Sequence, residues 1–172
     1  MRRHSNISDV EHEIVIFYRK LAADSWGIEC LSGIIKEQVS EGPKSYLMAV
    51  DESDRSKIGL DILFTLIKPH DTITVIHVTA VALDELGNAE SNLIYDYYTG
   101  TLSDDAPTTN TKFISILKKE GKTVGELIKE KVDELEPDFF ALSPRRDPEH
   151  KITALTEQMI VSVKANIILC KL

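Results

Sequence analysis

Residues 46–53 read Tyr-Leu-Met-Ala-Val-Asp-Glu-Ser, an apolar run of strand length that closes in a short polar turn. Residues 72–79, Thr-Ile-Thr-Val-Ile-His-Val-Thr, form a second run that is rich in β-branched side chains, which favour strands. Between the two runs, residues 56–68 place apolar side chains at helical spacing, and Pro69 ends that pattern. A strand, a helix and a second apolar strand in this order predict a parallel sheet covered by helices.

The same alternation continues along the rest of the chain. Further strands are predicted over 113–117, 138–142 and 167–170, and further helices over 124–135 and 152–164. Residues 44–172 are therefore predicted to form one α/β domain around a doubly wound, parallel, five-stranded sheet of the Rossmann-like type. Between the expected strands at 72–79 and 113–117, the sequence does not distinguish helix from strand over residues 91–98.

Residues 1–43 are predicted to form an N-terminal helical extension. Apolar side chains recur at helical spacing over residues 9–23 and again over residues 30–39, so two helices are expected. Gly42 and Pro43 then interrupt the pattern, and the boundary of the α/β domain is placed there.

Composition and charge restrict the class of protein. The chain has 172 residues and a formal net charge of −8, which disfavours a general nucleic-acid binder because phosphates require clustered Lys and Arg. Cys30 and Cys170 form no CxxC pair, so a metal site or disulfide framework is not expected and a reducing compartment is favoured. No apolar run reaches the ~18–20 residues that span a bilayer. We expect a cytoplasmic protein that binds neither nucleic acid nor membranes.

Ligands of an open parallel sheet bind beyond the carboxyl ends of its strands, where the strand order reverses. That rule selects four segments, 50–54, 77–80, 117–121 and 143–150. The candidate nucleotide-binding residues are Val50, Asp51, Ser53, His77, Val78, Ser143, Arg145, Arg146 and Thr156.

Each candidate also has a structural interpretation. Asp51 could contact a ribose or a metal, or it could place a favourable negative charge at a helix N-terminus. Ser53 and Thr156 could be ligand groups or N-caps, with the cap favoured for Ser53. His77 has no Cys or His neighbour at ligand spacing, so a structural histidine is favoured over a metal ligand. Arg145 and Arg146 could bind phosphate through paired guanidinium contacts or lie in a solvated loop.

The order of these motifs resembles the universal stress protein family over about three quarters of the chain. Residues 46–53 look like the family's opening strand with its Val-Asp-x-Ser ending, and 73–78 look like the second strand, which closes in His-Val. Residues 120–121 and 137–142 resemble the family's Gly turn and Asp-led fourth strand. The resemblance implies an adenine nucleotide alpha hydrolase-like fold and a homodimer formed through the C-terminal strand, residues 166–172.

Members of that family that bind ATP carry a Gly-x-x-Gly loop after the fourth strand and a later Gly-Ser or Gly-Thr. Such glycines let backbone N–H groups cradle phosphates. Here residues 143–146 read Ser-Pro-Arg-Arg, and Leu155-Thr156 stands at the later position, so all three glycines are absent. The resemblance therefore implies a non-catalytic regulatory or stress-response domain with weak or absent ATP binding. The alternative is an ATP- or AMP-binding protein whose phosphate loop uses arginines.

Catalysis is not expected. The sequence offers no acid/base pair and no Ser/His/Asp or Cys/His set with local support. Gly121-Lys122-Thr123 lacks the earlier glycine of a Walker A loop, because Ile116 stands at that position.

Overall fold

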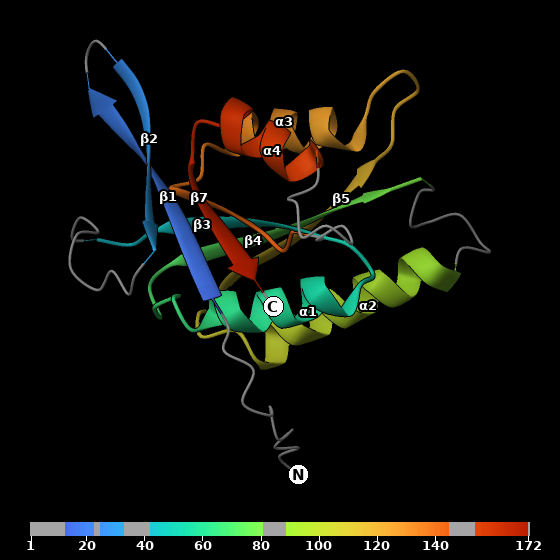
Figure 1. Cartoon of the computed structure of the whole chain (residues 1–172). Helices are drawn as coiled ribbons and strands as arrows, with labels where there is room; N and C mark the ends of the chain where they lie inside the picture. Colours follow the sequence, from blue (N-terminus) through green and yellow to red (C-terminus); the bar gives the residue numbers. More distant parts are fainter. Residues whose placement is uncertain (1–12, 23–24, 33–41, 81–88, 145–153, 172) are drawn as a thin grey trace.

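The computed structural model describes residues 13–22, 25–32, 42–80, 89–144 and 154–171. A single sheet lies between two layers of helices (Figure 1). Helices α1 (Asp54–Phe64) and α2 (Ala89–Asp104) cover one face, and α3 (Val124–Leu135) and α4 (Ala154–Ser162) cover the other. The strands are β1 (Glu13–Ala22), β2 (Ser25–Ser32), β3 (Ser45–Val50), β4 (Thr72–Thr79), β5 (Asn110–Leu117), β6 (Phe139–Leu142) and β7 (Asn166–Lys171).

The predicted doubly wound parallel sheet is confirmed. The strand order is β2-β1-β7-β6-β3-β4-β5, and the five strands from β7 to β5 are parallel. The chain runs outward from β3 to β4 and β5, and then returns to β6 and β7 on the other side of β3. The strand order therefore reverses between β3 and β6, and their carboxyl ends define the switch point where a ligand site is expected.

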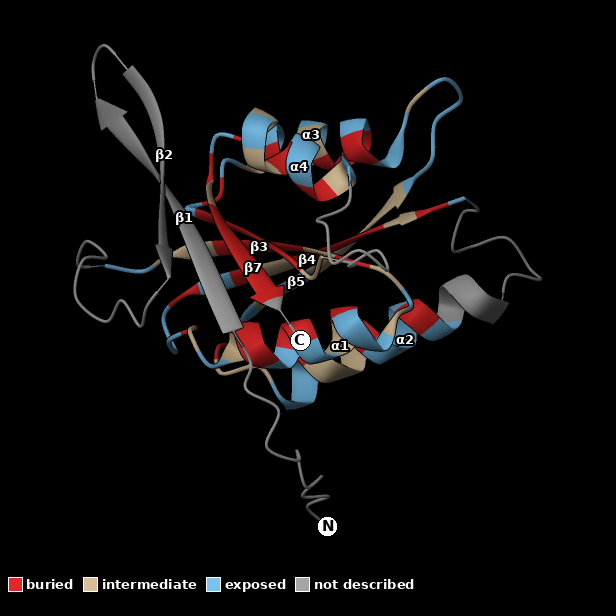
Figure 2. Ribbon diagram, viewed as in Figure 1, coloured by how far each residue is buried: buried red, intermediate tan, exposed pale blue. Residues whose placement is uncertain are grey.

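Two apolar cores hold the layers together. One core lies between the sheet and α1 and α2, and it includes Met48, Leu63 and Tyr98; the other lies beneath α3 and α4 and includes Phe140 and Met159. Side chains alternate between the two faces of each strand, so the continuous apolar runs of β3 and β6 supply both cores. Figure 2 shows the buried residues gathered on the central strands and on the helix faces that turn towards them.

A buried carboxylate joins the starts of two strands. Asp71 is 2% exposed, and its Oδ1 accepts a hydrogen bond from the backbone N–H of Lys44 (2.8 Å) just before β3. Its Oδ2 accepts from the backbone N–H of Lys68 (2.8 Å), after α1. The Thr108 hydroxyl donates to the Asp71 carbonyl (2.7 Å). Asp71 therefore fixes the connection between α1 and β4 against the start of β3.

The N-terminal helices were a wrong prediction. Residues 13–22 and 25–32 are antiparallel strands, β1 and β2, which extend the same sheet. Residues 9–12, 23 and 33–39 of the two expected helices lie outside the described part. The helical interpretation weighed residues spaced three and four apart. It gave too little weight to the contiguous run Ile14–Tyr18, whose β-branched and aromatic side chains favour strands.

Strand β7 does not form an edge of the sheet. β1 pairs antiparallel with it over five residue pairs, from Glu13 opposite Lys171 to Phe17 opposite Ile167. The resemblance implies a homodimer through this strand, but the outer side of the strand is occupied by a strand of the same chain. The ambiguous residues 91–98 are helical and lie inside α2.

Candidate functional site

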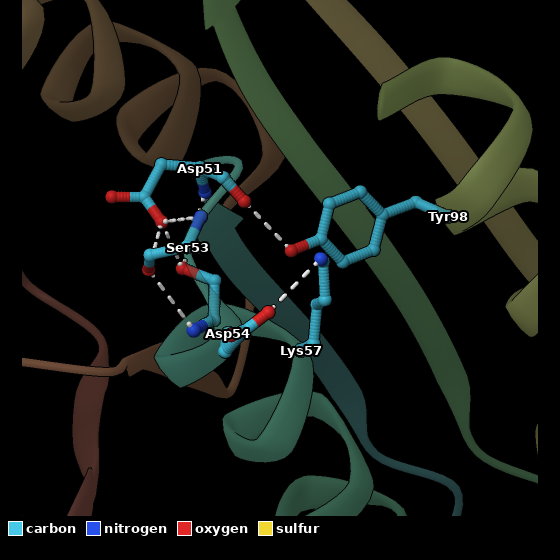
Figure 3. Close-up of polar contacts among 6 residues, drawn as sticks. Asp51, Ser53, Asp54, Lys57 and Tyr98 are labelled. Carbon is cyan, nitrogen blue, oxygen red and sulfur yellow. Dashed lines mark hydrogen bonds and ion pairs between the residues drawn. The ribbon is translucent and has the colours of Figure 1, made fainter. Parts of the chain in front are cut away.

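The turn after β3 is organised around the Asp51 carboxylate (Figure 3). Its Oδ1 accepts hydrogen bonds from the Ser53 backbone N–H (3.0 Å), from the Ser56 hydroxyl (2.7 Å) and from the Ser53 hydroxyl. The Ser53 hydroxyl caps α1 by accepting from the backbone N–H of Ser56 (3.4 Å). The structure therefore brings Asp51 and Ser53 together, and it gives the Ser53 side chain the N-cap role favoured from the sequence.

Tyr98 holds this turn from a distant helix. Its hydroxyl donates to the carbonyl oxygen of Asp51 (2.8 Å) across 47 residues of sequence (Figure 3). Burial raises the pKa of the Tyr98 phenol, and the nearby Asp51 raises it further, so the hydroxyl keeps its proton. Sequence reasoning missed this residue; the one available signal was the aromatic cluster at residues 95–98.

Lys57 makes an ion pair and a cation–π contact beside the same turn. Lys57 Nζ lies 3.1 Å from Asp54 Oδ1 and 5.1 Å from the centroid of the Tyr97 ring. Because Asp54 is largely exposed, this pair contributes little to stability. The start of α1 thus carries Asp51 and Asp54, and these negative charges favour the helix N-terminus and oppose the approach of a phosphate.

His77 lies on β4 beside Val50 of β3 and is 8% exposed. Burial lowers the pKa of its imidazole, while the negative charges of Glu52 and Asp51 act in the opposite direction and only partly offset burial. Among the described residues no group of three His, Cys, Asp or Glu side chains could hold a metal ion. The surroundings of His77 support the structural interpretation.

A pH dependence of stability follows from His77. Its pKa is lower in the folded protein than the usual 6.5, so the unfolded chain binds more protons below that pH. The contribution of His77 to the free energy of unfolding is therefore fully present above pH 6.5, and it is lost as the pH falls from 6.5 towards the pKa of the folded protein. Urea unfolding at pH 7.5 and 5.5 should show a smaller loss in His77→Gln than in the parent. An equal loss in both proteins would show that His77 is not responsible.

On the other side of the switch point, a side chain fills the space beside α1. Ser143 follows β6, and its hydroxyl is buried without a hydrogen-bond partner among the described residues. It lies so close to Gly59 of α1 that a Cβ there would be 1.7 Å from the Ser143 Oγ. The position where the resemblance to universal stress proteins implies a glycine thus carries a side chain packed against a helix.

A similar arrangement occurs at the later glycine position. Leu155 belongs to α4, and a Cβ added to Gly125 of α3 would be 2.9 Å from its Cδ1 and 2.8 Å from the Oε1 of Gln158 on the same helix. The neighbouring Thr156 is 3% exposed, and its side chain lies within the fold. Glycines on α1 and α3 therefore provide space for Ser143 and Leu155, which stand at two positions where the resemblance implies a glycine.

Four candidate nucleotide-binding residues remain. Two lie in the apolar cores, and two lie outside the described residues. Val50 is 8% exposed in the core beneath α1, and Val78 is partly buried against the core beneath α3. Arg145 and Arg146 lie outside the described residues. Pro144 precedes them and has no backbone N–H to offer a phosphate.

An open hollow of about 490 Å³ lies at the carboxyl ends of β4 and β5, within the predicted segment 117–121. Its lining residues are Ala80, Lys118, Lys119, Glu120, Gly121, Lys122 and Thr123. The adjacent N-terminus of α3 is closed by a capping box, in which Thr123 and Glu126 satisfy each other's backbone N–H groups. Lys122 is paired with Glu130. The hollow is basic, but the carboxylate of Glu126 already occupies the N-terminus of α3 beside it.

Neither a family model nor a curated protein matches the sequence. Solved structures do match. A universal stress protein from Archaeoglobus fulgidus superposes with a TM-score of 0.56 at 15% identity, covering 74% of this chain and 93% of that one. The chain has the universal stress protein fold. Its membership of the family remains a resemblance, because the identities are low.

Two matching universal stress proteins contain nucleotides. A family protein from Arabidopsis thaliana with AMP bound gives a TM-score of 0.52 at 12% identity, covering 75% of this chain and 92% of that one. An Archaeoglobus fulgidus universal stress protein in complex with dAMP gives a TM-score of 0.53 at 14% identity, covering 74% of this chain and 98% of that one.

Among the described residues, no helix is both long and apolar enough to cross a membrane.

Proposed function

We propose that this chain is a non-catalytic, universal-stress-protein-like regulatory domain with weak or absent ATP binding. One observation carries the proposal: the side chains that replace two phosphate-binding glycines are packed into the fold, Ser143 against Gly59 and Leu155 against Gly125. A cradle for phosphate needs bare backbone N–H groups that a ligand can approach closely. Side chains at these positions keep a phosphate away from the backbone.

The chemistry of the described groups supports a non-catalytic role. Burial raises the pKa of the Cys170 thiol to about 12, so it is not a reactive thiolate near neutral pH. The Asp51 carboxylate is engaged by the Ser53 and Ser56 groups that shape its own turn. A general base needs access to a substrate proton, and these contacts give Asp51 a structural task instead.

A second candidate function is binding of an adenine nucleotide such as ATP or AMP. Matching folds with AMP and dAMP bound support it, and so does the placement of Asp51 at the switch point. In this version Arg145 and Arg146 would replace the lost backbone donors with bidentate contacts to phosphate.

Thermal unfolding with and without 5 mM Mg-ATP, AMP or dAMP separates the two functions. A ligand at about 100 times its Kd adds about 2.7 kcal/mol, which raises Tm by roughly 5–10 °C for a domain of this size. We expect a rise below about 2 °C with each nucleotide, as for a Kd of about 5 mM or weaker. A rise above about 5 °C would refute weak or absent binding.

A matched pair of variants identifies the phosphate contact if such a rise occurs. Arg145→Ala with Arg146→Ala should abolish it, whereas Lys118→Ala with Lys119→Ala removes the same charge from the basic hollow and should leave it unchanged. If instead the Lys118, Lys119 variant abolishes the rise and the Arg145, Arg146 variant leaves it unchanged, the nucleotide binds in the hollow.

The proposal includes a cytoplasmic location and a homodimer as predictions. A homodimer through residues 166–172 requires that β1 first separates from β7, because β1 occupies the side of β7 on which another copy would pair.

A further inference from the structure

The far end of the sheet carries a long free edge. β5 pairs with β4 along all eight of its residues, and no other described strand pairs with its opposite side. Every β5 side chain is exposed or only half-buried, and Leu117 is 49% exposed. Unpaired backbone groups on such an edge are a template for another strand.

The hydrogen-bond pattern shows which backbone groups are unpaired. The Lys118 N–H donates to the Thr79 carbonyl (2.7 Å), so residue 118 directs its backbone towards β4. Backbone direction alternates along a strand, so the even-numbered residues face β4 as well. The residues that direct N–H and C=O groups outward are Thr111, Phe113, Ser115 and Leu117.

Apolar side chains flank this edge. Phe113 is half-buried, and Tyr95 of α2 packs edge-on against its ring with centroids 5.5 Å apart. Tyr95 is itself 41% exposed, so an aromatic surface borders the strand on the α2 side. Ile114 and Ile116 are half-buried on the opposite face of the strand. A strand added here would cover apolar surface on both faces of the sheet.

The charges at the two ends of β5 are opposite. Asp104, the last residue of α2, and Asp105 are exposed before the start of the strand, so this end is acidic. Lys118 and Lys119 follow the strand and are exposed. Antiparallel pairing with an identical strand sets the acidic end of one copy beside the basic end of the other. Parallel pairing would instead set like charges together.

We propose that a second copy of this chain docks on the β5 edge, antiparallel and with the two-fold axis at Ile114. In this register Phe113 of each copy is opposite Ser115 of the other, so the outward backbone groups exchange hydrogen bonds. The only charged side chain within the strand, Lys112, is then opposite Ile116 rather than its own copy. The contact leaves the pairing of β1 with β7 intact and is independent of nucleotide binding.

Sedimentation of the full chain tests the proposal. At about 50 μM, where a dimer with a micromolar Kd is mostly assembled, we expect a species of twice the 19.3 kDa chain mass. Ser115→Pro removes an outward N–H without touching the ladder to β4, and it should raise the dissociation constant at least about tenfold. Ser115→Ala keeps the N–H and should remain dimeric.

Two further variants keep the test valid if Ser115→Pro does not fold. Leu117→Lys places a charge on a half-exposed edge position and should also weaken the dimer. Lys118→Glu with Lys119→Glu should weaken it, and adding Asp104→Lys with Asp105→Lys should restore it. Lys131→Glu with Lys164→Glu changes the net charge equally, away from the edge, and should have no effect.

Two results would overturn the proposal. One is a monomer at about 100 μM, since specific dimers of functional strength assemble well below that concentration. The other is a dimer that Leu117→Lys and the Lys118, Lys119 charge reversal both leave unchanged, which would place the interface elsewhere, including at β7.

Discussion

Asp71→Ala is expected to lower the free energy of unfolding by about 3 kcal/mol, because it leaves the backbone N–H groups of Lys44 and Lys68 without their buried acceptor. Each hydrogen bond to a charged group contributes roughly 1.5–3 kcal/mol. For a chain of this length the loss corresponds to a Tm lower by roughly 6–12 °C.

Asp138 provides the matched control. Its Oδ2 accepts hydrogen bonds from the Ser45 N–H (2.8 Å) and hydroxyl (2.9 Å), so it ties the start of β6 to β3 as Asp71 ties β4. Asp138 is exposed, and water can replace its bonds, so Asp138→Ala should cost about 1 kcal/mol. Urea unfolding of both variants checks the difference. Equal losses would show that burial does not set the value of the Asp71 contacts.

Ile114→Pro is expected to cost at least about 3 kcal/mol of folding free energy. Residue 114 directs its N–H towards β4, as Lys118 does four residues later, so proline removes a hydrogen bond inside the sheet. It also removes a half-buried isoleucine from the core beneath α3. The denaturant midpoint, with hydrogen exchange of the β4 amides, measures the effect.

Ser115→Pro is the internal control, because the adjacent residue directs its N–H outward. Proline is tolerated on an edge strand where the missing N–H would have faced away from the sheet, so this variant should lose less than half as much stability at a dilution where the chain is monomeric. If Ser115→Pro is the more damaging of the two, the backbone alternation assigned to β5 is wrong.

The elements of the α/β domain could be predicted because local signals mark their ends. Thr123 and Glu126 form a capping box at the start of α3, and Glu136 ends that helix in a left-handed conformation (φ 44°) before Pro137. The predicted limits of residues 72–79 and 124–135 agree with β4 and α3. Continuous apolar strands and amphipathic helices then admit few topologies.

The contacts that shape the site could not be predicted in the same way. Tyr98 bonds to the Asp51 carbonyl, and Ser143 packs against Gly59, between segments that are far apart in sequence. No local pattern indicates which glycine faces which serine. The sequence shows Ser143 and Leu155 where the resemblance implies glycines, and the structure adds that both side chains lie against glycines on the facing helices.

The N-terminal strands illustrate a limit of periodicity. A short run such as Ile14–Tyr18 fits either a helix or a strand, and the decision depends on a partner strand. β1 has two partners, β2 directly after it and β7 about 150 residues later, and no local feature of the N-terminal segment points to β7.

The pairing of β1 with β7 also sets an order of folding. β1 and β2 are adjacent in sequence and can form a hairpin by themselves, but the strand that receives β1 is the last strand of the fold. We expect β7 to pair with β6 before the hairpin docks, because β6 and β7 are closer in sequence than β1 and β7. Contacts between such distant segments form slowly. Within this sheet β1 and β2 precede the other strands in the chain and are expected to join it last, and until they dock the β7 edge is open to other chains.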